Sequence, residues 1–423
     1  MSFYYHFYMD LFAKLKQNKG PLGKYSSVAQ GYFAFPKLEG PIGPSMRFRG
    51  QQVLVWSLNN YLGLANHPSV READGEAAMQ YGLGYPMGAR MMSGNSDLLE
   101  ELERELSAFV EKEDTLVLNY GYQGILSVID AILSRHDVAI YDSECHASIV
   151  DGLRLHAGSR FVFPHNNIQS LTRQLEKATR LTQQSSGGIL VITEGVFGMA
   201  GDMGNLREIV ELKKKFSFRL LVDDAHGFGT MGESGAGTGE EQGVQEGIDL
   251  YFSTFAKAMA GIGAFVSSQK DVIDYLRYNT RSQIFAKTLP MPMVAGLKTR
   301  LQLLKAHPGF RNKLWEVARV LQSELRKKGF NIGQTTSPVT PVILNGTIGE
   351  ALRLIVDLRE NYHIFCSVVI YPVVPKGTIM LRLIPTAEHT LEDVRVTVEA
   401  FEQVAVKLTN GAYEKNIAEL IVG

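Results

Sequence analysis

The sequence lacks the features that mark secreted, membrane-spanning and nucleic-acid-binding proteins. Two of its 423 residues are cysteine, Cys145 and Cys366, so there is no disulfide framework and a reducing compartment is expected. A membrane-spanning helix needs about 18 or more consecutive apolar residues, and the sequence contains no such run. The formal net charge is -1, with acidic and basic residues interspersed, which argues against a nucleic-acid partner.

The beginning of the chain also lacks the charged region and the small-residue cleavage site of a signal peptide, so we expect a cytoplasmic protein. It is aromatic instead, with Phe3, Tyr4, Tyr5, Phe7 and Tyr8 close together. Two interpretations stay open for this segment. It either docks on the protein's own surface or makes peripheral contact with a membrane interface.

What the sequence does contain is a repeated alternation of strand and helix patterns. Apolar strands are expected at residues 115–118, 138–141, 160–163, 189–193, 219–222, 248–253 and 262–267. Helical periodicity occurs between most of them, near residues 122–134, 147–157, 168–182 and 205–216. This alternation predicts an α/β fold with a mainly parallel sheet that helices cover on both faces.

Three parts are predicted along the chain. Residues 1–55 form an N-terminal arm and linker with a Gly/Pro-rich run at 40–44, and residues 56–295 form a large domain. Within it, residues 97–112 are helical, and Asp97 with Glu100 resembles the helix start. Residues 296–423 form a smaller α+β domain, with helical patterns at 295–306, 308–329, 349–360 and 391–408.

Lys257 lies in a tight connection between two predicted core strands, among the small residues of 256–263 (AKAMAGIG). An unpaired ammonium is costly to bury. Burial therefore lowers the pKa of a lysine, and the neutral amine can form a Schiff base with a carbonyl. The alternative is an ordinary lysine on a surface turn.

Other candidate residues also lie just beyond predicted strands, where ligands bind in parallel sheets. These residues are Gly121, His146, Glu194, Asp223 and His226. Gly121 opens a helix whose free N–H groups suit a phosphate, although a bare strand–helix turn has the same pattern. His146 taken alone also fits a structural role. No spacing of histidine, cysteine and aspartate makes a metal site, which argues against a metal hydrolase.

Taken together, these residues suit pyridoxal 5′-phosphate (PLP). Lys257 supplies the amine for a Schiff base, and Asp223 supplies a carboxylate that keeps the pyridine nitrogen protonated. A histidine and a helix start that can cradle phosphate complete the set. In such sites the protein orients the cofactor and the cofactor carries the chemistry.

The order and spacing of several motifs resemble the α-oxoamine synthase family of fold-type I PLP enzymes. The markers are residues 59–64 (NNYLGL), 88–90 (GAR), 146–148 (HAS), 193–197 (TEGVF), 222–227 (VDDAHG), 254–257 (TFAK), and Arg382 ahead of 386–390 (TAEHT). The resemblance covers roughly residues 45–405. It implies a fold-type I PLP-dependent transferase that works as a homodimer.

The resemblance also implies a role for each cofactor-binding residue. Lys257 carries PLP as a Schiff base, and Asp223 pairs with the pyridine nitrogen. His146 stacks on the ring, and His226 contacts the 3′-oxygen of the ring.

The phosphate and the substrate are assigned in the same way. Gly121 and Tyr122 present backbone amides to the phosphate, and Thr254 adds a hydroxyl. Asn59 and Arg382 hold the substrate carboxylate, which the guanidinium can bind bidentately.

Three departures from the family pattern bear on the substrate. Gly198 stands where the family has serine. Lys287 replaces a neutral residue in segment 285–290 (FAKTLP), which the resemblance implies reaches the phosphate of a neighbouring subunit. This lysine either pairs with that phosphate or faces an anionic group of the substrate. Asn119 and Tyr120 replace small residues before Gly121.

The implied reaction is the decarboxylative condensation of an amino acid with an acyl thioester, either acyl-CoA or acyl carrier protein. Serine with a long-chain acyl group, as in sphingolipid base synthesis, is the preferred interpretation. Cysteate, as in sulfonolipid synthesis, is the close alternative, and 8-amino-7-oxononanoate synthase and glycine C-acetyltransferase are further family members. A plain aminotransferase would share Lys257 and Asp223 but need no thioester, whereas a non-catalytic partner subunit would lack the lysine.

Overall fold

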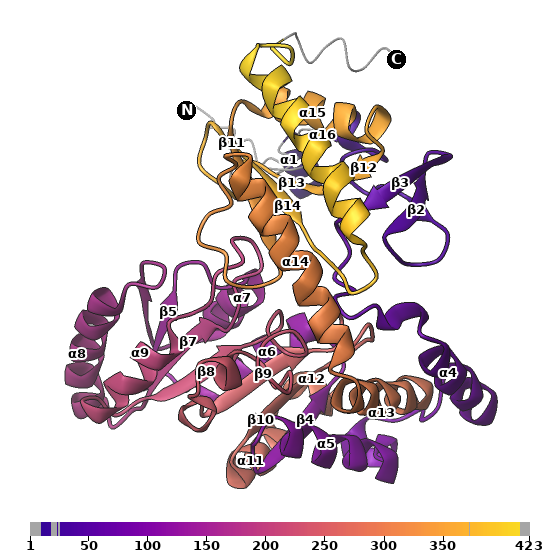
Figure 1. Ribbon diagram of the computed structural model, residues 1–423. Helices are drawn as coiled ribbons and strands as arrows, with labels where there is room; N and C mark the ends of the chain where they lie inside the picture. Colours follow the sequence, from indigo (N-terminus) through magenta and orange to yellow (C-terminus); the bar gives the residue numbers. More distant parts are fainter. Residues whose placement is uncertain (1–9, 18–22, 24–25, 372, 415–423) are drawn as a thin grey trace, which may run out of the picture.

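A seven-stranded sheet forms the centre of the computed structural model, which describes residues 10–17, 23, 26–371 and 373–414 (Figure 1). The strands are β4 (Asp114–Leu118), β5 (Val138–Asp142), β6 (Ser159–Phe163), β7 (Ile189–Glu194), β8 (Arg219–Asp223), β9 (Leu250–Thr254) and β10 (Ala264–Ser268). Their order in the sheet is β4-β10-β9-β8-β7-β5-β6. All pairs among β5, β6, β7, β8 and β9 are parallel, which confirms the predicted mainly parallel sheet.

One strand runs the other way, because β10 is antiparallel to both of its neighbours, β4 and β9. Parallel neighbours need a crossover connection of about a dozen or more residues. Only residues 255–263 separate β9 from β10. The chain therefore reverses directly, and this short reversal carries Lys257.

Helices cover both faces of the sheet, as predicted. The helices are α5 (Asp97–Phe109), α8 (Ile168–Ser185), α9 (Leu206–Glu211) and α13 (Met291–Ala306) on one side, and α6 (Gly121–Ile132), α7 (Ala147–Leu155) and α11 (Lys270–Asn279) on the other. Neighbouring strand residues alternate between the two cores. Val117 packs in the first core, and Leu116 and Leu118 pack in the second.

Some helix details differ from the sequence prediction. α5 begins at Asp97 as expected, but its cap is Ser96, whose Oγ accepts the Leu99 N–H at 3.2 Å. α4 (Pro68–Tyr81) packs against α13 and was not predicted. Two further short helices, α10 (Thr238–Glu241) and α12 (Arg281–Ile284), lie in connections.

The C-terminal part has its own sheet and core. β11 (Thr340–Asn345), β14 (Thr378–Leu383) and β13 (Ser367–Val369) form an antiparallel sheet in that order. It packs with α14 (Gly309–Lys327), α15 (Ile348–Glu360) and α16 (Leu391–Thr409), which confirms the predicted helices there. Figure 1 shows α14 running between the large sheet and this smaller unit.

Residues near the N-terminus join this smaller unit. β1 (Leu38–Glu39), β2 (Ser45–Phe48), β3 (Gln51–Val55) and β12 (Ile364–Phe365) form a sheet in that order, after α1 (Leu11–Gln17) and α3 (Ser26–Ala29). The predicted boundaries at residues 55 and 295 stay predictions. The aromatic segment of residues 3–8 lies outside the described residues.

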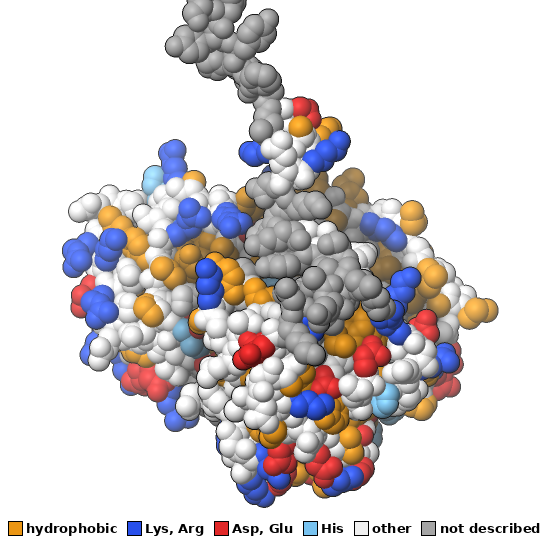
Figure 2. Space-filling model, turned by 90° about the horizontal axis from the view of Figure 1, so that it is seen from above, with side chains coloured by type: hydrophobic (Ala, Val, Ile, Leu, Met, Phe, Trp, Pro, Cys, Tyr) orange, Lys and Arg blue, Asp and Glu red, His pale blue; other side chains and the backbone are white. Residues whose placement is uncertain are grey.

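The described surface mixes charges of both signs, as the net charge of the sequence leads one to expect. On the face seen in Figure 2, lysine and arginine side chains are interspersed with acidic and apolar ones. Within the described residues, no helix is long and apolar enough to cross a membrane.

A buried arginine ties the N-terminal sheet to α15. Arg359 is 4% exposed, and its guanidinium lies 4.0 Å from the ring centroid of Phe365, with the rings of Tyr32 and Phe48 also within 5.5 Å. Its Nη1 donates to the Tyr32 carbonyl at 2.5 Å. Burial lowers the pKa of Arg359, so the aromatic faces and the carbonyl offset part of the cost of holding a charge there.

We predict that Arg359→Met lowers the free energy of unfolding by about 2 kcal/mol, because a desolvated cation–π contact and a hydrogen bond are lost. Urea unfolding followed by circular dichroism measures the change. The matched control is Arg319→Met, which removes an exposed guanidinium 5.2 Å from the Trp315 ring and should cost well under half as much. Equal losses for the two variants would contradict the prediction.

Candidate active site

The carboxyl ends of the strands bring the predicted residues to one edge of the large sheet. Gly121 follows β4, His146 follows β5, Asp223 ends β8 and Thr254 ends β9, with Lys257 three residues further on. Parallel strands place such ends together, which is why the strand pattern located them.

Lys257 lies partly buried beside two carboxylates. Desolvation lowers its pKa to about 8, although the charges of Asp223 and Glu194 act in the opposite direction. A substantial fraction of the amine is therefore neutral near pH 8, as a nucleophile requires.

Asp223 and Glu194 occupy the same level of adjacent parallel strands, β8 and β7. The pKa of Asp223 is raised to about 6, because burial raises it more than the charge of Lys257 and the Ala225 N–H, at 3.1 Å, lower it. The pKa of Glu194 is raised well above its usual range by burial and then by the charge of Asp223. Glu194 therefore keeps the proton of this pair, and Asp223 carries the negative charge.

His226 is a neutral, partly buried imidazole. Burial lowers its pKa well below the usual range, and the charges of Lys257 and Arg382 lower it further. Its Nδ1 lies 2.7 Å from the Tyr61 hydroxyl. A Cβ on Gly198 would lie 2.1 Å from His226 Nε2, so a larger side chain has no room there in this arrangement.

The start of α6 forms an open cradle. No side chain caps this helix among the described residues, so its first N–H groups point outward unpaired. A Cβ on Gly121 would lie 3.1 Å from Thr254 Oγ1, which shows how closely Thr254 approaches the backbone there. Tyr122 follows with its side chain 46% exposed.

His146 lies on the exposed side of the cluster. Its Nδ1 is 2.7 Å from Ser148 Oγ, and its backbone N–H donates to Glu194 Oε1 at 2.5 Å. Burial and the charge of Lys257 lower its pKa. Its ring centroid is 6.1 Å from that of Tyr122.

The smaller sheet contributes Arg382, from β14. Its Nη2 lies 3.3 Å from Asn59 Oδ1, and its charge acts on both Lys257 and His226. The structure therefore brings both predicted carboxylate-binding residues to the cluster, although they come from opposite ends of the chain.

Lys287 lies close to the cradle through its backbone. Its carbonyl accepts a hydrogen bond from Asn119 Nδ2 at 2.6 Å, and residues 287–288 pair with residues 88–89. Its side chain is exposed and makes no hydrogen bond or ion pair with the part of the chain that the structure describes. Its reach toward a second subunit stays a prediction.

Sequence reasoning missed two contributors and gave Glu194 no role. Tyr61 holds His226, and its place inside the 59–64 motif was the available signal. Met199 Sδ lies 3.9 Å from Arg382 Nη1, and only the neighbouring Gly198 marked that position in the sequence.

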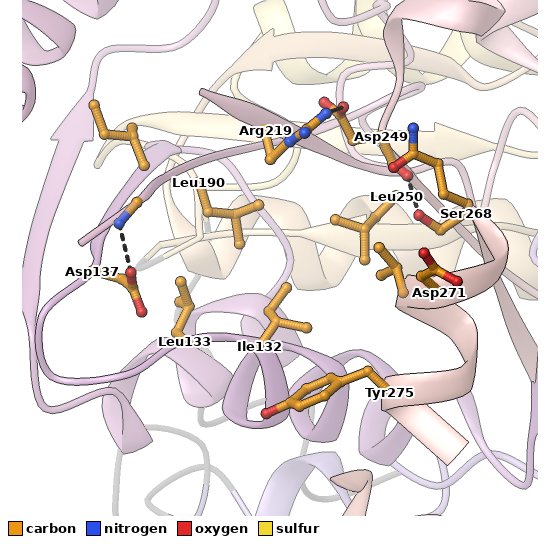
Figure 3. Close-up of a pocket in the computed structure, with 14 residues that line it drawn as sticks. Ile132, Leu133, Asp137, Leu190, Arg219, Asp249, Leu250, Ser268, Asp271 and Tyr275 are labelled. Atoms are coloured by element: carbon orange, nitrogen blue, oxygen red, sulfur yellow. Dashed lines mark hydrogen bonds and ion pairs between the residues drawn. The ribbon is translucent and has the colours of Figure 1, made fainter. Parts of the chain in front are cut away.

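A separate hollow of about 390 Å³ lies at the opposite, amino ends of the strands (Figure 3). Apolar side chains from α6, β7, β9 and α11 line it, with Arg219 and Asp249 at its edge. None of the predicted site residues lines it, so we assign it no part in the chemistry. Within the described residues, no group of three or more histidine, cysteine or acidic side chains is arranged to hold a metal ion.

Comparison with known proteins agrees with this geometry. The family model for aminotransferase class I and II matches residues 51–401. The chain is 56% identical to the cysteate-C-fatty acyltransferase of Capnocytophaga ochracea over 97% of this chain and 98% of that one. It is 36% identical to the 8-amino-7-oxononanoate synthase of Thermoanaerobacter pseudethanolicus over 88% and 92% of the two chains.

Solved structures show the same fold. A serine palmitoyltransferase from S. paucimobilis, solved with PLP and myriocin, is 28% identical, with a TM-score of 0.86. The similarity covers 95% of this chain and 100% of that one.

The chain belongs to the α-oxoamine synthase family of fold-type I PLP-dependent acyltransferases. Its site fits that cofactor on structural grounds. A depressed lysine pKa, a charged strand-end carboxylate and an uncapped helix start beside Thr254 are all present.

We predict that covalent uptake of PLP by the apoenzyme accelerates with rising pH and levels off above about 8, because the neutral fraction of Lys257 grows through that pKa. Stopped-flow absorbance between about pH 6 and about pH 10 measures this rate. Lys112→Arg is the control and should leave this pH dependence unchanged. Burial also lowers the pKa of Lys112 to about 8, but its Nζ donates to the Ile248 carbonyl, away from the site. A rate that continues to rise up to the ordinary lysine pKa would contradict the prediction.

Proposed function

We propose that the protein condenses cysteate with a long-chain acyl thioester, releasing carbon dioxide and forming a sulfonated 3-keto amine. The observation that carries this proposal is the 56% identity, across nearly the whole chain, to a cysteate-C-fatty acyltransferase. Serine, which the sequence alone favoured, is the second candidate, supported by 34% identity to the serine palmitoyltransferase of Bacteriovorax stolpii.

The residues of the site divide the work of this reaction. Bound PLP supplies an electron sink next to the amino acid's α-carbon. Asp223, charged because Glu194 keeps the proton of the pair, holds the ring nitrogen protonated. Lys257 would take the α-proton, and Arg382 with Asn59 would hold the α-carboxylate and so fix the orientation of the amino acid. The α-carbon would then bond to the acyl carbon as the thiolate leaves, the carboxylate would depart as carbon dioxide, and the proton held by Lys257 would return to the α-carbon.

Cysteate carries a second anion, and we propose that Lys287 binds it. The Asn119 contact holds the Lys287 backbone beside the cofactor cradle while its ammonium stays exposed. A charge-assisted contact of this kind is worth about 1.5–3 kcal/mol, which corresponds to roughly 10- to 150-fold in affinity.

A homodimer belongs to the same proposal, because segment 285–290 is expected to reach a neighbouring subunit. The support is a group of exposed apolar side chains at residues 79–92 and 285. So many exposed apolar side chains close together are uncommon on the surface of a monomer. These side chains are Met79, Leu83, Tyr85, Met87, Met91, Met92 and Phe285. A second copy of the chain is the proposed occupant of this surface.

Spectral titration of the PLP-loaded enzyme tests the substrate. We predict that cysteate changes the visible spectrum at lower concentration than serine, alanine or glycine, and that carbon dioxide appears only after a long-chain acyl thioester is added. Lys287→Ala should weaken cysteate binding by about tenfold or more and leave serine binding within about twofold.

Lys270→Ala is the control, because Lys270 is exposed on α11 and paired with Asp274 at 2.6 Å. Turnover of cysteate with a keto acid and no thioester would replace the proposal with a plain aminotransferase. Preference for serine with the expected thioester dependence would keep the reaction class and move the amino acid to the second candidate. Equal weakening of both amino acids, with lower PLP affinity, would assign Lys287 to the cofactor phosphate.

We also propose that the protein is cytoplasmic and makes peripheral contact with a lipid surface through α1. Both cysteines, Cys145 and Cys366, are free and buried, which suits a reducing compartment. α1 has no buried residue. Its apolar side chains Leu11, Phe12 and Leu15 are 65%, 70% and 57% exposed. Lys14 and Lys16 in the same helix suit anionic headgroups.

We predict that the enzyme cosediments with vesicles of phosphatidylglycerol and phosphatidylethanolamine. The triple variant Leu11→Ser/Phe12→Ser/Leu15→Ser should bind them at least about tenfold more weakly, because three apolar side chains no longer enter the interface. Phe35→Ser, which removes a 79% exposed ring elsewhere, is the control. Wild-type enzyme that stays in the supernatant would rule the contact out.

A further inference from the structure

His165, which follows β6, joins two carboxylates, one at the end of β5 and one in the turn after β7. Its Nδ1 lies 3.0 Å from Asp142 Oδ1, and its Nε2 lies 2.7 Å from Asp202 Oδ2. Burial lowers the pKa of His165, but the hydrogen bonds and charges of the two carboxylates outweigh it and raise the pKa to about 10. At neutral pH the ring is therefore an imidazolium that donates from both nitrogens.

The Asp142 side of this bridge is fixed. Asp142 ends β5 and is fully buried. It also accepts the backbone N–H groups of Glu144 and Asn166, each at 2.9 Å. Removing His165 would leave these contacts in place.

The Asp202 side depends far more on His165. Asp202 Oδ1 is buried and has no hydrogen-bond partner among the described residues. Its Oδ2 takes the bond from His165 and a longer contact, 3.3 Å, from Asn166 Nδ2. The Phe197 ring also stands edge-on against His165, with centroids 4.4 Å apart.

Asp202 belongs to a turn, residues 196–203, that reaches the active site. The Phe197 N–H donates to the Asp202 carbonyl at 2.9 Å, which links the two ends of the turn. Gly198 packs on His226, and Met199 Sδ lies 3.9 Å from Arg382 Nη1. The turn therefore touches the two residues that face the ring oxygen of PLP and the substrate carboxylate.

The far side of the turn is held by the smaller unit. The Gly201 carbonyl accepts the backbone N–H groups of Thr336 and Ser337 at 3.1 and 3.0 Å. The turn is thus hydrogen-bonded on one side to the loop at residues 335–337 and on the other side to the imidazolium of His165.

We propose that His165 is a positioning residue for the amino-acid substrate: by holding Asp202 it keeps the turn at residues 196–203 against Arg382 and His226. This inference rests on the proposed function in two respects, the role of Arg382 at the substrate carboxylate and the role of His226 at the ring oxygen of PLP. The competing explanation is that His165 only neutralises two buried carboxylates and so stabilises the fold.

Two variants separate these explanations. His165→Gln removes the bridge, and Asp202→Asn weakens only its turn side, so the second variant decides the matter should the first fail to fold. For both we expect the dissociation constant of the amino acid, measured by spectral titration, to rise by about tenfold or more. The KM of the acyl thioester should stay unchanged, and the ratio of the absorption bands of bound PLP should shift as His226 moves.

A readout that needs no cofactor accompanies these measurements. In the apoenzyme, limited proteolysis with chymotrypsin should cut the turn at Phe197 faster in both variants than in wild type. The amounts of intact protein and of fragments, measured over time by mass spectrometry, give the cleavage rate.

The control is His156→Gln, which removes another buried histidine, one whose Nε2 bonds to the Asp137 carbonyl at 3.2 Å, remote from the turn. It should lower thermal stability and leave amino-acid affinity, band ratio and cleavage at Phe197 unchanged. His165 variants that behave like this control, destabilised but with wild-type amino-acid affinity, would overturn the proposal. A wild-type enzyme without a spectral response to any amino acid would instead refute the proposed function, before any variant is compared.

Discussion

The active site depends on one electrostatic constraint, a lysine placed beside two buried carboxylates at the ends of adjacent parallel strands. Glu194 and Asp223 are paired residues on the adjacent strands β7 and β8, and the charge of Lys257 lowers the pKa of both. Burying three charged groups together is costly unless their protonation states adjust. The adjustment leaves a charged Asp223, a protonated Glu194 and a lysine whose pKa is low enough for nucleophilic chemistry.

The strand pattern of the sequence was enough to find this cluster. Asp223 and Lys257 follow apolar strands, and the ends of parallel strands meet at one edge of a sheet. The pattern could not reveal that β10 is antiparallel, because an apolar run looks the same in either direction. The number of residues between β9 and β10 held that information. Ser96 was missed as the cap of α5 for a similar reason, since Asp97 offers the same local signal one residue later.

Contacts between distant parts of the chain were harder to foresee. The resemblance named Asn59 and Arg382, but neither residue's own surroundings in the sequence indicate that they meet. Tyr61 contacts His226, and Met199 contacts Arg382, across separations of 165 and 183 residues in the chain. Residue-by-residue patterns describe local preference, whereas these contacts depend on how two sheets are set against each other.

The pairing of β3 with β12 has a consequence for how the chain is made. On the ribosome, β2 and β3 emerge early, but the strand that completes their sheet, at Ile364 and Phe365, emerges only after most of the polypeptide. Until then one edge of β3 has no strand beside it, and an open edge invites pairing with other chains. Every strand of the large sheet precedes residue 269, so this sheet can form during this interval. Arg382, which follows β12 in the chain, therefore meets Asn59 only late in synthesis, so the contact proposed to hold the substrate carboxylate is assembled last.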